Sequence, residues 1–135
     1  MDDDGEWNPS DYAIHLTRRA RGLPFWFSLA ANGTDEYTRA MEHTLTVARE
    51  AARLIKEHPN LDLLMEPTLS IVAFTRKGWN AEDYQEWSDD LLADQIGFVT
   101  PSSHKGKPIL RFAIVNPWTF EKDLKAILEI GRAHV

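Results

Sequence analysis

Apolar residues recur at three- and four-residue spacing through one long stretch of the chain, residues 34–58. The stretch opens with Thr34, whose hydroxyl can cap a helix, and two acids follow it near the positive end of the helix dipole. Pro59 ends the stretch, because proline cannot continue a helix. We therefore predict a helix from residue 34 to about residue 58 with one face on a core. Its predicted core positions are Tyr37, Met41, Leu45, Ala48, Ala52 and Ile55.

The segment before this helix has a different character. Residues 1–12 are acidic and contain glycine, asparagine and proline, which predicts a solvated loop. Residues 17–33 predict helix in two pieces, with Pro24 in the first turn of the second piece. The pair Asn32-Gly33 closes the second piece, since it tolerates a positive φ.

After Pro59 the spacing of apolar residues changes from that of a helix to that of strands. Short, partly β-branched runs predict strands at 61–64, 69–74, 97–99 and 109–115, with a loop at 101–108. Helices are expected at 81–94, capped by Asn80, and at 120–129. The order predicts an α+β fold in which a mostly antiparallel sheet carries its helices on one face.

Composition narrows the class of protein. Of the 135 residues, 43% are hydrophobic and 27% are charged, as in ordinary soluble domains. The net charge of −6 disfavours a nucleic-acid binder, and no apolar run reaches the ~20 residues that a membrane span needs. The acidic N-terminus has the wrong charge for a secretory signal, so we expect a cytoplasmic protein. The chain has no cysteine and its five histidines are scattered, so no metal site is expected.

Arg111 is the main candidate for chemistry. It lies inside a strand-like run that is apolar on both faces, and alternation puts it on the face of Ala113 and Val115. A guanidinium in a site without water needs a carboxylate or a phosphate as its partner. The same sequence pattern would also arise if Arg111 lay on a solvent-exposed face or paired with a structural acid. Two interpretations are likewise open for the cluster Arg18, Arg19 and Arg21. It could form an anion-binding edge, or it could be helix charge at a domain or subunit interface. The serines beside His104, at 102 and 103, are interpreted as an ordinary turn.

Two longer strings resemble a known family. TRRARGLPFWFSLAANGTDEY, with its arginine pair, Trp26 and Gly33, resembles the segment after the mobile loop of group II pyridoxal-phosphate-dependent amino-acid decarboxylases. PILRFAIVNP, followed by Thr119 and Asp123, resembles their late strand and last helix. The resemblance covers roughly residues 7–129.

The resemblance implies a C-terminal fragment of a fold type I enzyme. Residues 1–33 would be the end of the mobile loop and a helical arm from the large domain, and 34–129 the small C-terminal domain. Residues 130–135 form a tail, either natural or a translated sequencing adapter. The lysine and the other residues that hold pyridoxal phosphate would lie upstream, so we expect no catalytic, cofactor-binding or metal residue in this chain. Arg111 would approach the substrate carboxylate, in a homodimeric parent enzyme that releases carbon dioxide from an amino acid.

Two alternatives stay open. One is another fold type I enzyme, such as an aminotransferase, an aldolase or a different lyase. The other is a free-standing α+β module that binds a small acid through Arg111. Phe25, Trp26, Phe27 and Leu29 disfavour the free-standing module, because such a cluster needs a partner surface.

Overall fold

The structure is a computed structural model that describes residue 14 and residues 19–130. The chain divides into two compact units, Met1–Tyr37 and Thr38–Val135. The N-terminal arginine cluster falls partly outside the described residues, because Arg18 is not among them.

The first unit contains the helix α1, Gly22–Asn32, and the first turn of α2, Thr34–Glu57. Gly33 separates the two helices with a φ of 78°, a conformation that glycine adopts without strain. The predicted helix end at Asn32-Gly33 and the predicted start at Thr34 are therefore confirmed. Pro24 lies in the first turn of α1, where its missing N–H is tolerated.

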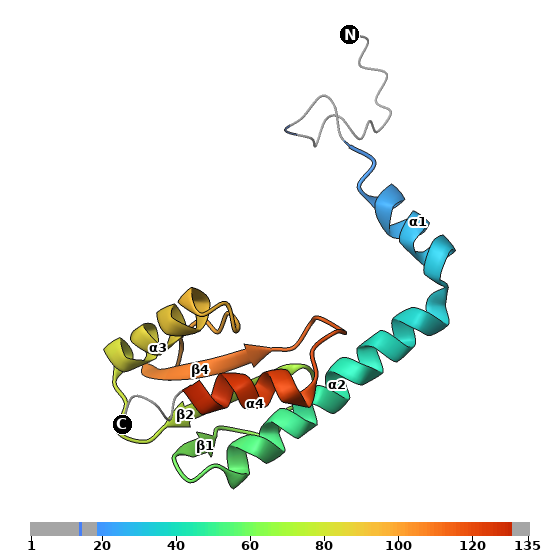
Figure 1. Cartoon of the computed structure of the whole chain (residues 1–135). Coiled ribbons are helices and arrows are strands. Elements are labelled where there is room, and N and C mark those ends of the chain that lie inside the picture. Colours follow the sequence, from blue (N-terminus) through green and yellow to red (C-terminus); the bar gives the residue numbers. More distant parts are fainter. Residues whose placement is uncertain (1–13, 15–18, 131–135) are drawn as a thin grey trace. The chain divides into compact units, whose positions relative to one another are not determined.

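The second unit is built on a four-stranded antiparallel sheet in the order β1-β2-β4-β3 (Figure 1). Its strands are β1 Leu61–Leu63, β2 Ile71–Arg76, β3 Ser102–His104 and β4 Lys107–Ala113. In the centre of the sheet Val72 pairs with Phe112, and Phe74 pairs with Leu110. The remaining helices are α3, Ala81–Ala93, and α4, Glu121–Ile130.

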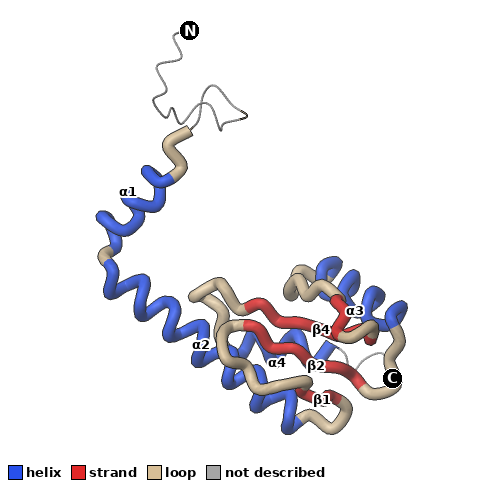
Figure 2. Tube along the Cα trace, turned by 180° about the vertical axis from the view of Figure 1, so that it is seen from behind, coloured by secondary structure: helices blue, strands red, loops and turns tan. Residues whose placement is uncertain are grey.

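One face of the sheet forms the core. Val72, Phe74, Leu110 and Phe112 are almost fully buried and share one cluster with side chains of α2, α3 and α4. The other face is turned away from the helices, as the view from behind shows (Figure 2). The predicted α+β fold with helices on one face of a mostly antiparallel sheet is confirmed.

The core side of α2 begins later than the sequence pattern suggests. Its buried residues are Thr44, Val47, Ala48, Ala51, Ala52 and Ile55. Met41 is 59% exposed and Leu45 is half-buried, so the prediction that these two positions face the core is wrong for Met41 and only partly right for Leu45. The spacing identifies the apolar stripe, but it carries no information on where the sheet beneath the helix ends.

Two predicted elements between α3 and β4 are also wrong. Residues 97–99 form no strand: the chain here packs against α4, where an added Cβ on Gly97 would come within 3.1 Å of Ile127. Residues 102–104, expected within a loop, form β3. A two-residue turn joins β3 to β4, with positive φ at Lys105 (51°) and Gly106 (75°), which matches the twist of an antiparallel hairpin. The strand was missed because its residues are polar.

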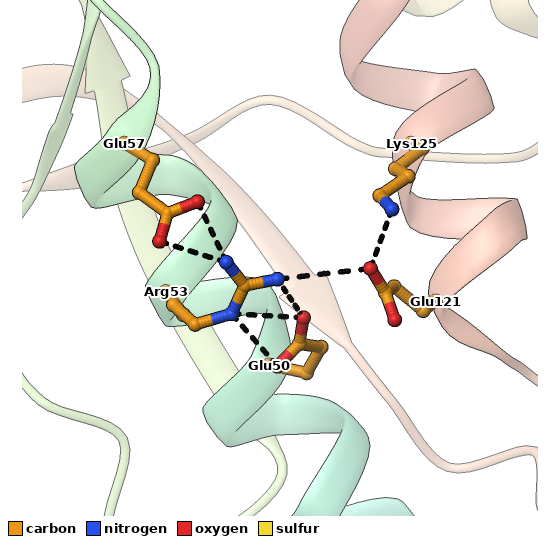
Figure 3. A network of polar contacts seen from close by, with 5 residues as sticks. All are labelled: Glu50, Arg53, Glu57, Glu121 and Lys125. Carbon is orange, nitrogen blue, oxygen red and sulfur yellow. Dashed lines mark hydrogen bonds and ion pairs between the residues drawn. The ribbon is translucent and has the colours of Figure 1, made fainter.

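A polar network links α2 to α4 on the outside of the helical layer (Figure 3). Arg53 donates hydrogen bonds to Glu50 and Glu57 on its own helix and lies 3.6 Å from Glu121 of α4, which also pairs with Lys125. The hydrogen bonds from Arg53 lower the pKa of Glu50, and the same carboxylates raise the pKa of Arg53. Because most of these side chains are largely exposed, the network adds little stability.

Candidate functional site

Arg111 stands on the uncovered face of the sheet. Alternation along β4 buries Leu110, Phe112 and Ile114 on the helical side and leaves Arg111 and Ala113 exposed. The predicted face of Arg111 is therefore correct. On the neighbouring strand Ala73 lies directly opposite Arg111.

The surroundings of Arg111 leave its guanidinium available. No hydrogen bond or ion pair joins the side chain of Arg111 to another residue of the described part of the chain. The flanking positions Ala73 and Ala113 have methyl side chains, which cannot reach over the guanidinium. This argues against a structural ion pair within the described part of the chain and leaves two interpretations, a solvated arginine or an anion-binding one.

A pocket of about 530 Å³ opens beside the C-terminal end of β4. Its walls come from the segment before β3, the end of β4 and the inner side of α4, and Phe98 and Trp118 stand exposed at its rim. Its polar lining residues are Asn116, Thr119 and Asp123.

Much of the polar lining of this pocket is engaged in the turn that precedes α4. The side-chain oxygen of Asn116 accepts from the Trp118 amide at 3.0 Å, and the carboxylate of Asp123 accepts from the Phe120 amide at 2.8 Å. From α2, Nε2 of His43 lies 2.9 Å from the carbonyl oxygen of Thr119, so this nitrogen carries the proton. The side chains of Asn116 and Asp123 are therefore already engaged, and the pocket offers both apolar and polar surface. Sequence reasoning missed it because its walls come from three separate segments.

A second arginine that the sequence did not single out lies at the end of β2. Arg76 is only 6% exposed, and its guanidinium carbon lies 4.4 Å from the centre of the Trp79 ring. Its Nη2 atom has no hydrogen-bond partner among the residues that the structure describes, and burial lowers the pKa of Arg76. The acids that line the crevice beside Trp79, including Asp83 and Glu86, form no ion pair with it.

The lysines do not fit a covalent cofactor site. All six are exposed: Lys56, Lys77, Lys105, Lys107, Lys122 and Lys125. Lys105 directly follows His104 in the sequence, but it lies at the tip of the β3–β4 turn with a φ of 51° and no walls around it. A lysine that forms a Schiff base needs an enclosed, partly desolvated site to lower its pKa.

The structure also shows how the potential metal ligands and the serine pair of the β3 segment are arranged. Within residue 14 and residues 19–130, no three His, Cys, Asp or Glu side chains gather where they could hold a metal ion. Ser102 and Ser103 alternate along β3, so they point to opposite sides of the hairpin.

None of the helices in the described part of the chain is long and apolar enough to cross a membrane.

Comparison with known proteins identifies the group to which this architecture is related. The chain is 26% identical to tyrosine decarboxylase 2 of Arabidopsis thaliana over 133 residues, and 30% identical to the aromatic-L-amino-acid decarboxylase of Cavia porcellus over 103 residues. These alignments cover 94% and 76% of the chain. This chain is a relative of the pyridoxal-phosphate-dependent amino-acid decarboxylases.

A solved structure of this decarboxylase group agrees. The glutamate decarboxylase domain of a diaminobutyrate-pyruvate transaminase and L-2,4-diaminobutyrate decarboxylase from Vibrio parahaemolyticus matches with a TM-score of 0.73 and 26% identity over 87% of the chain. The chain spans only 24%, 21% and 26% of the lengths of these three decarboxylases. No family model matches the chain. The resemblance to group II decarboxylases that the sequence predicted is confirmed.

Proposed function

We propose that this chain forms the C-terminal part of a pyridoxal-phosphate-dependent amino-acid decarboxylase, a carboxy-lyase that releases carbon dioxide from an L-amino acid. In this proposal residues 1–33 are the end of a mobile loop and an interdomain arm, 34–129 are the small C-terminal domain and 130–135 are a tail. The decarboxylase relatives support the assignment, since they align with most of the chain while being several times longer. The chain by itself is inactive.

The observation that carries the proposed role of this chain is the guanidinium of Arg111, which is exposed and has no ion-pair partner among the described residues. An arginine fork binds a carboxylate through two parallel N–H···O contacts, which fix the plane of the carboxylate as well as its position. The methyl side chains of Ala73 and Ala113 are too short to cover the exposed guanidinium. Arg111 would then bind the carboxylate of the amino-acid substrate and hold its orientation.

Pyridoxal phosphate supplies the electron sink for loss of carbon dioxide, which is chemistry of the cofactor itself. The exposed lysines of this chain do not fit its covalent attachment, so we place the attachment in the part of the parent enzyme outside this chain. The contribution of this chain is to bind the substrate carboxylate and to cover the reacting centre from water.

The exposed aromatic side chains of α1 support an interdomain arm. Phe25, Trp26 and Phe27 are 61%, 59% and 58% exposed, and Leu29 is half-buried. In the proposed parent enzyme, a cytoplasmic homodimer, the large domain covers them. A free-standing small-acid-binding module would not leave such a group uncovered, which makes it the weaker candidate. Another fold type I enzyme, such as an aminotransferase or an aldolase, is the closer alternative.

The experiment that tests this proposal replaces Arg111 in the complete polypeptide that contains this segment. Arg111→Lys keeps the charge and loses the two-point contact, so kcat/KM for carbon dioxide release falls by roughly ten- to a thousandfold, about 1.4–4 kcal/mol of transition-state binding. Lys107→Gln removes a positive charge from the same strand and serves as the matched control, with unchanged kinetics. Normal turnover of Arg111→Lys together with a lower melting temperature would show a structural arginine instead.

The isolated chain offers a second test. Titration with pyridoxal phosphate followed by borohydride reduction should leave no stoichiometric label on any lysine, because none is enclosed. Labelling of one lysine at a ratio near one per chain would place the cofactor site inside these residues and overturn the assignment of the missing part.

A further inference from the structure

The pocket at the C-terminal end of β4 is built wholly from residues of the second unit. Its walls are the segment before β3, the end of β4, the turn that follows it and α4, and its volume is about 530 Å³. Small-molecule sites in proteins have volumes of roughly 300–1,000 Å³ and combine apolar walls with a few polar groups. The pocket therefore has the size and the mixed lining of a site for one small molecule.

Two aromatic rings are exposed at the rim of this pocket. Phe98 is 70% exposed and Trp118 is 77% exposed, although both are large apolar side chains. Phe112, Ile114 and Leu124, which also line the pocket, are at most 5% exposed and form its apolar floor. Exposed rings beside an apolar floor can pack against an aromatic ligand, and such ring pairs contribute more than the burial of their area alone. The apolar part of the lining thus favours an aromatic ligand.

Among the described residues that line the pocket, Asp123 alone is charged. It is half-buried in the first turn of α4, where its Oδ2 accepts a hydrogen bond from the Phe120 amide at 2.8 Å. Its Oδ1 makes no hydrogen bond or ion pair with another described residue. A carboxylate that is partly shielded from water attracts a cation, and hydrogen bonds between an ammonium group and a carboxylate are among the stronger ones. The charge of the lining thus favours an amine.

The walls of the pocket are held by contacts that leave Phe98, Trp118 and Oδ1 of Asp123 available. From α2, Nε2 of His43 donates to the carbonyl oxygen of Thr119, and the His43 ring lies 5.2 Å from the ring of Phe120. In the segment before β3, Gly97 approaches α4 so closely that an added Cβ would lie 3.1 Å from Ile127. Both wall segments are therefore packed against helices, and a preorganised site loses less entropy when a ligand binds.

We propose that this pocket binds a small aromatic amine, with the ring of the ligand against Phe98 and Trp118 and its ammonium group on the carboxylate of Asp123. All three residues belong to the second unit, so the proposal does not depend on the decarboxylase assignment. Since the site offers one ion pair and an exposed rim, an amine of about ten non-hydrogen atoms should bind with a dissociation constant on the order of 0.1–1 mM.

Photoaffinity labelling of the complete polypeptide that contains this segment tests the site. The probe is an aryl-azide derivative of N,N-dimethylphenethylamine, a tertiary amine that cannot condense with the aldehyde of pyridoxal phosphate. Mass spectrometry of the digested protein should find the label in peptides that contain residues 96–99 or 116–127, and unmodified N,N-dimethylphenethylamine should compete for it. The neutral azidophenethyl alcohol and the anionic azidophenylpropionate should label these peptides at least about threefold less.

Substitutions separate the charge from the rings. Asp123→Asn keeps an oxygen that can accept from the Phe120 amide, so it should raise the dissociation constant of the amine roughly three- to tenfold and leave labelling by the alcohol unchanged. Glu121→Gln removes a charge from the same turn outside the pocket and is the matched control, with no change in binding. Trp118→Ala should weaken labelling by both probes, and Trp118→Phe, which retains a ring, should restore it. Thermal unfolding confirms that each variant is folded.

Three results would overturn the proposal. The first is labelling by the alcohol or the acid that equals labelling by the amine, because Asp123 would then not select the ligand. The second is labelling that neither Asp123→Asn nor Trp118→Ala changes. The third is a complete polypeptide that takes no label at residues 96–99 or 116–127, because another part of that polypeptide would then fill the pocket.

Discussion

The buried guanidinium of Arg76 allows a sharp prediction about stability. Its side chain is 6% exposed, its Nη2 has no described hydrogen-bond partner, and its pKa is lowered by burial. Desolvating a charge in a protein costs several kcal/mol, whereas a cation–π contact such as that with Trp79 returns about 0.5–2 kcal/mol. Since no acid among the described residues pairs with Arg76, its charge is expected to lose more free energy by desolvation than it gains from the cation–π contact. Arg76→Met keeps the aliphatic stem under Trp79 and removes the charge, so it should stabilise the chain by about 1–2 kcal/mol.

A companion variant separates charge from packing. Arg76→Ala also removes the aliphatic part of the side chain beside Trp79. The free energy of unfolding lost with this packing should exceed the gain from removing the charge by about 1–2 kcal/mol. The expected order of stability is thus Met above Arg above Ala at this position. Thermal and urea unfolding measure it, with about 4–8 °C in melting temperature for each kcal/mol in a domain of this size. A lower melting temperature for Arg76→Met would refute the reasoning, since it would mean that Arg76 has a carboxylate or water partner that the unpaired Nη2 does not reveal.

Three further outcomes are expected in the isolated chain. Asn80→Ala removes both hydrogen bonds that the side chain accepts at the start of α3 and should cost about 0.5–2 kcal/mol, measured by urea unfolding. Gly106→Val places a β-branched residue at a φ of 75° and should cost more than about 1 kcal/mol, with loss of β3–β4 amide protection in hydrogen exchange. The lowered pKa of Glu50 means that its ionised carboxylate stabilises the folded state. This contribution to the free energy of unfolding is present at a pH above the ordinary pKa of 4.5, and it is lost as the pH falls through the lower pKa of the folded state. The difference in unfolding free energy between the wild type and Glu50→Gln should therefore stay below about 1 kcal/mol at pH 7 and shrink on acidification.

The parts of the fold that the sequence predicted correctly are those with strong local signals. Thr34 and Pro59 delimit α2 because capping and the missing proline N–H act at the residue itself. Asn80 likewise marks the start of α3, where its side chain and that of Asp83 form a reciprocal capping box. Period-two burial along β4 placed Arg111 on the correct face, because alternation needs no knowledge of the neighbouring strands.

The errors arose where tertiary contacts decide. Ser102–His104 became a strand only because a tight turn brings these polar residues against Lys107–Ile109. Residues 97–99 are apolar enough for a strand, yet they pack on α4 through Gly97 and Ile127. Met41 follows the helical spacing of the core residues but lies beyond the part of α2 that the sheet covers. None of these outcomes is encoded within a window of neighbouring residues.

The candidate site shows the same division between local and distant information. Alternation could show that Arg111 shares a face with Ala113, but only the pairing of β2 with β4 shows that Ala73 lies directly opposite it. Whether an arginine is structural or available for a ligand depends on that neighbour, some forty residues away in the sequence. The contrast with Arg76 makes the point: among the described residues neither arginine has an ion pair, but Arg76 is buried against the ring of Trp79 and Arg111 is exposed on the uncovered face of the sheet. We therefore propose the carboxylate-binding role for Arg111 and a packing role for Arg76.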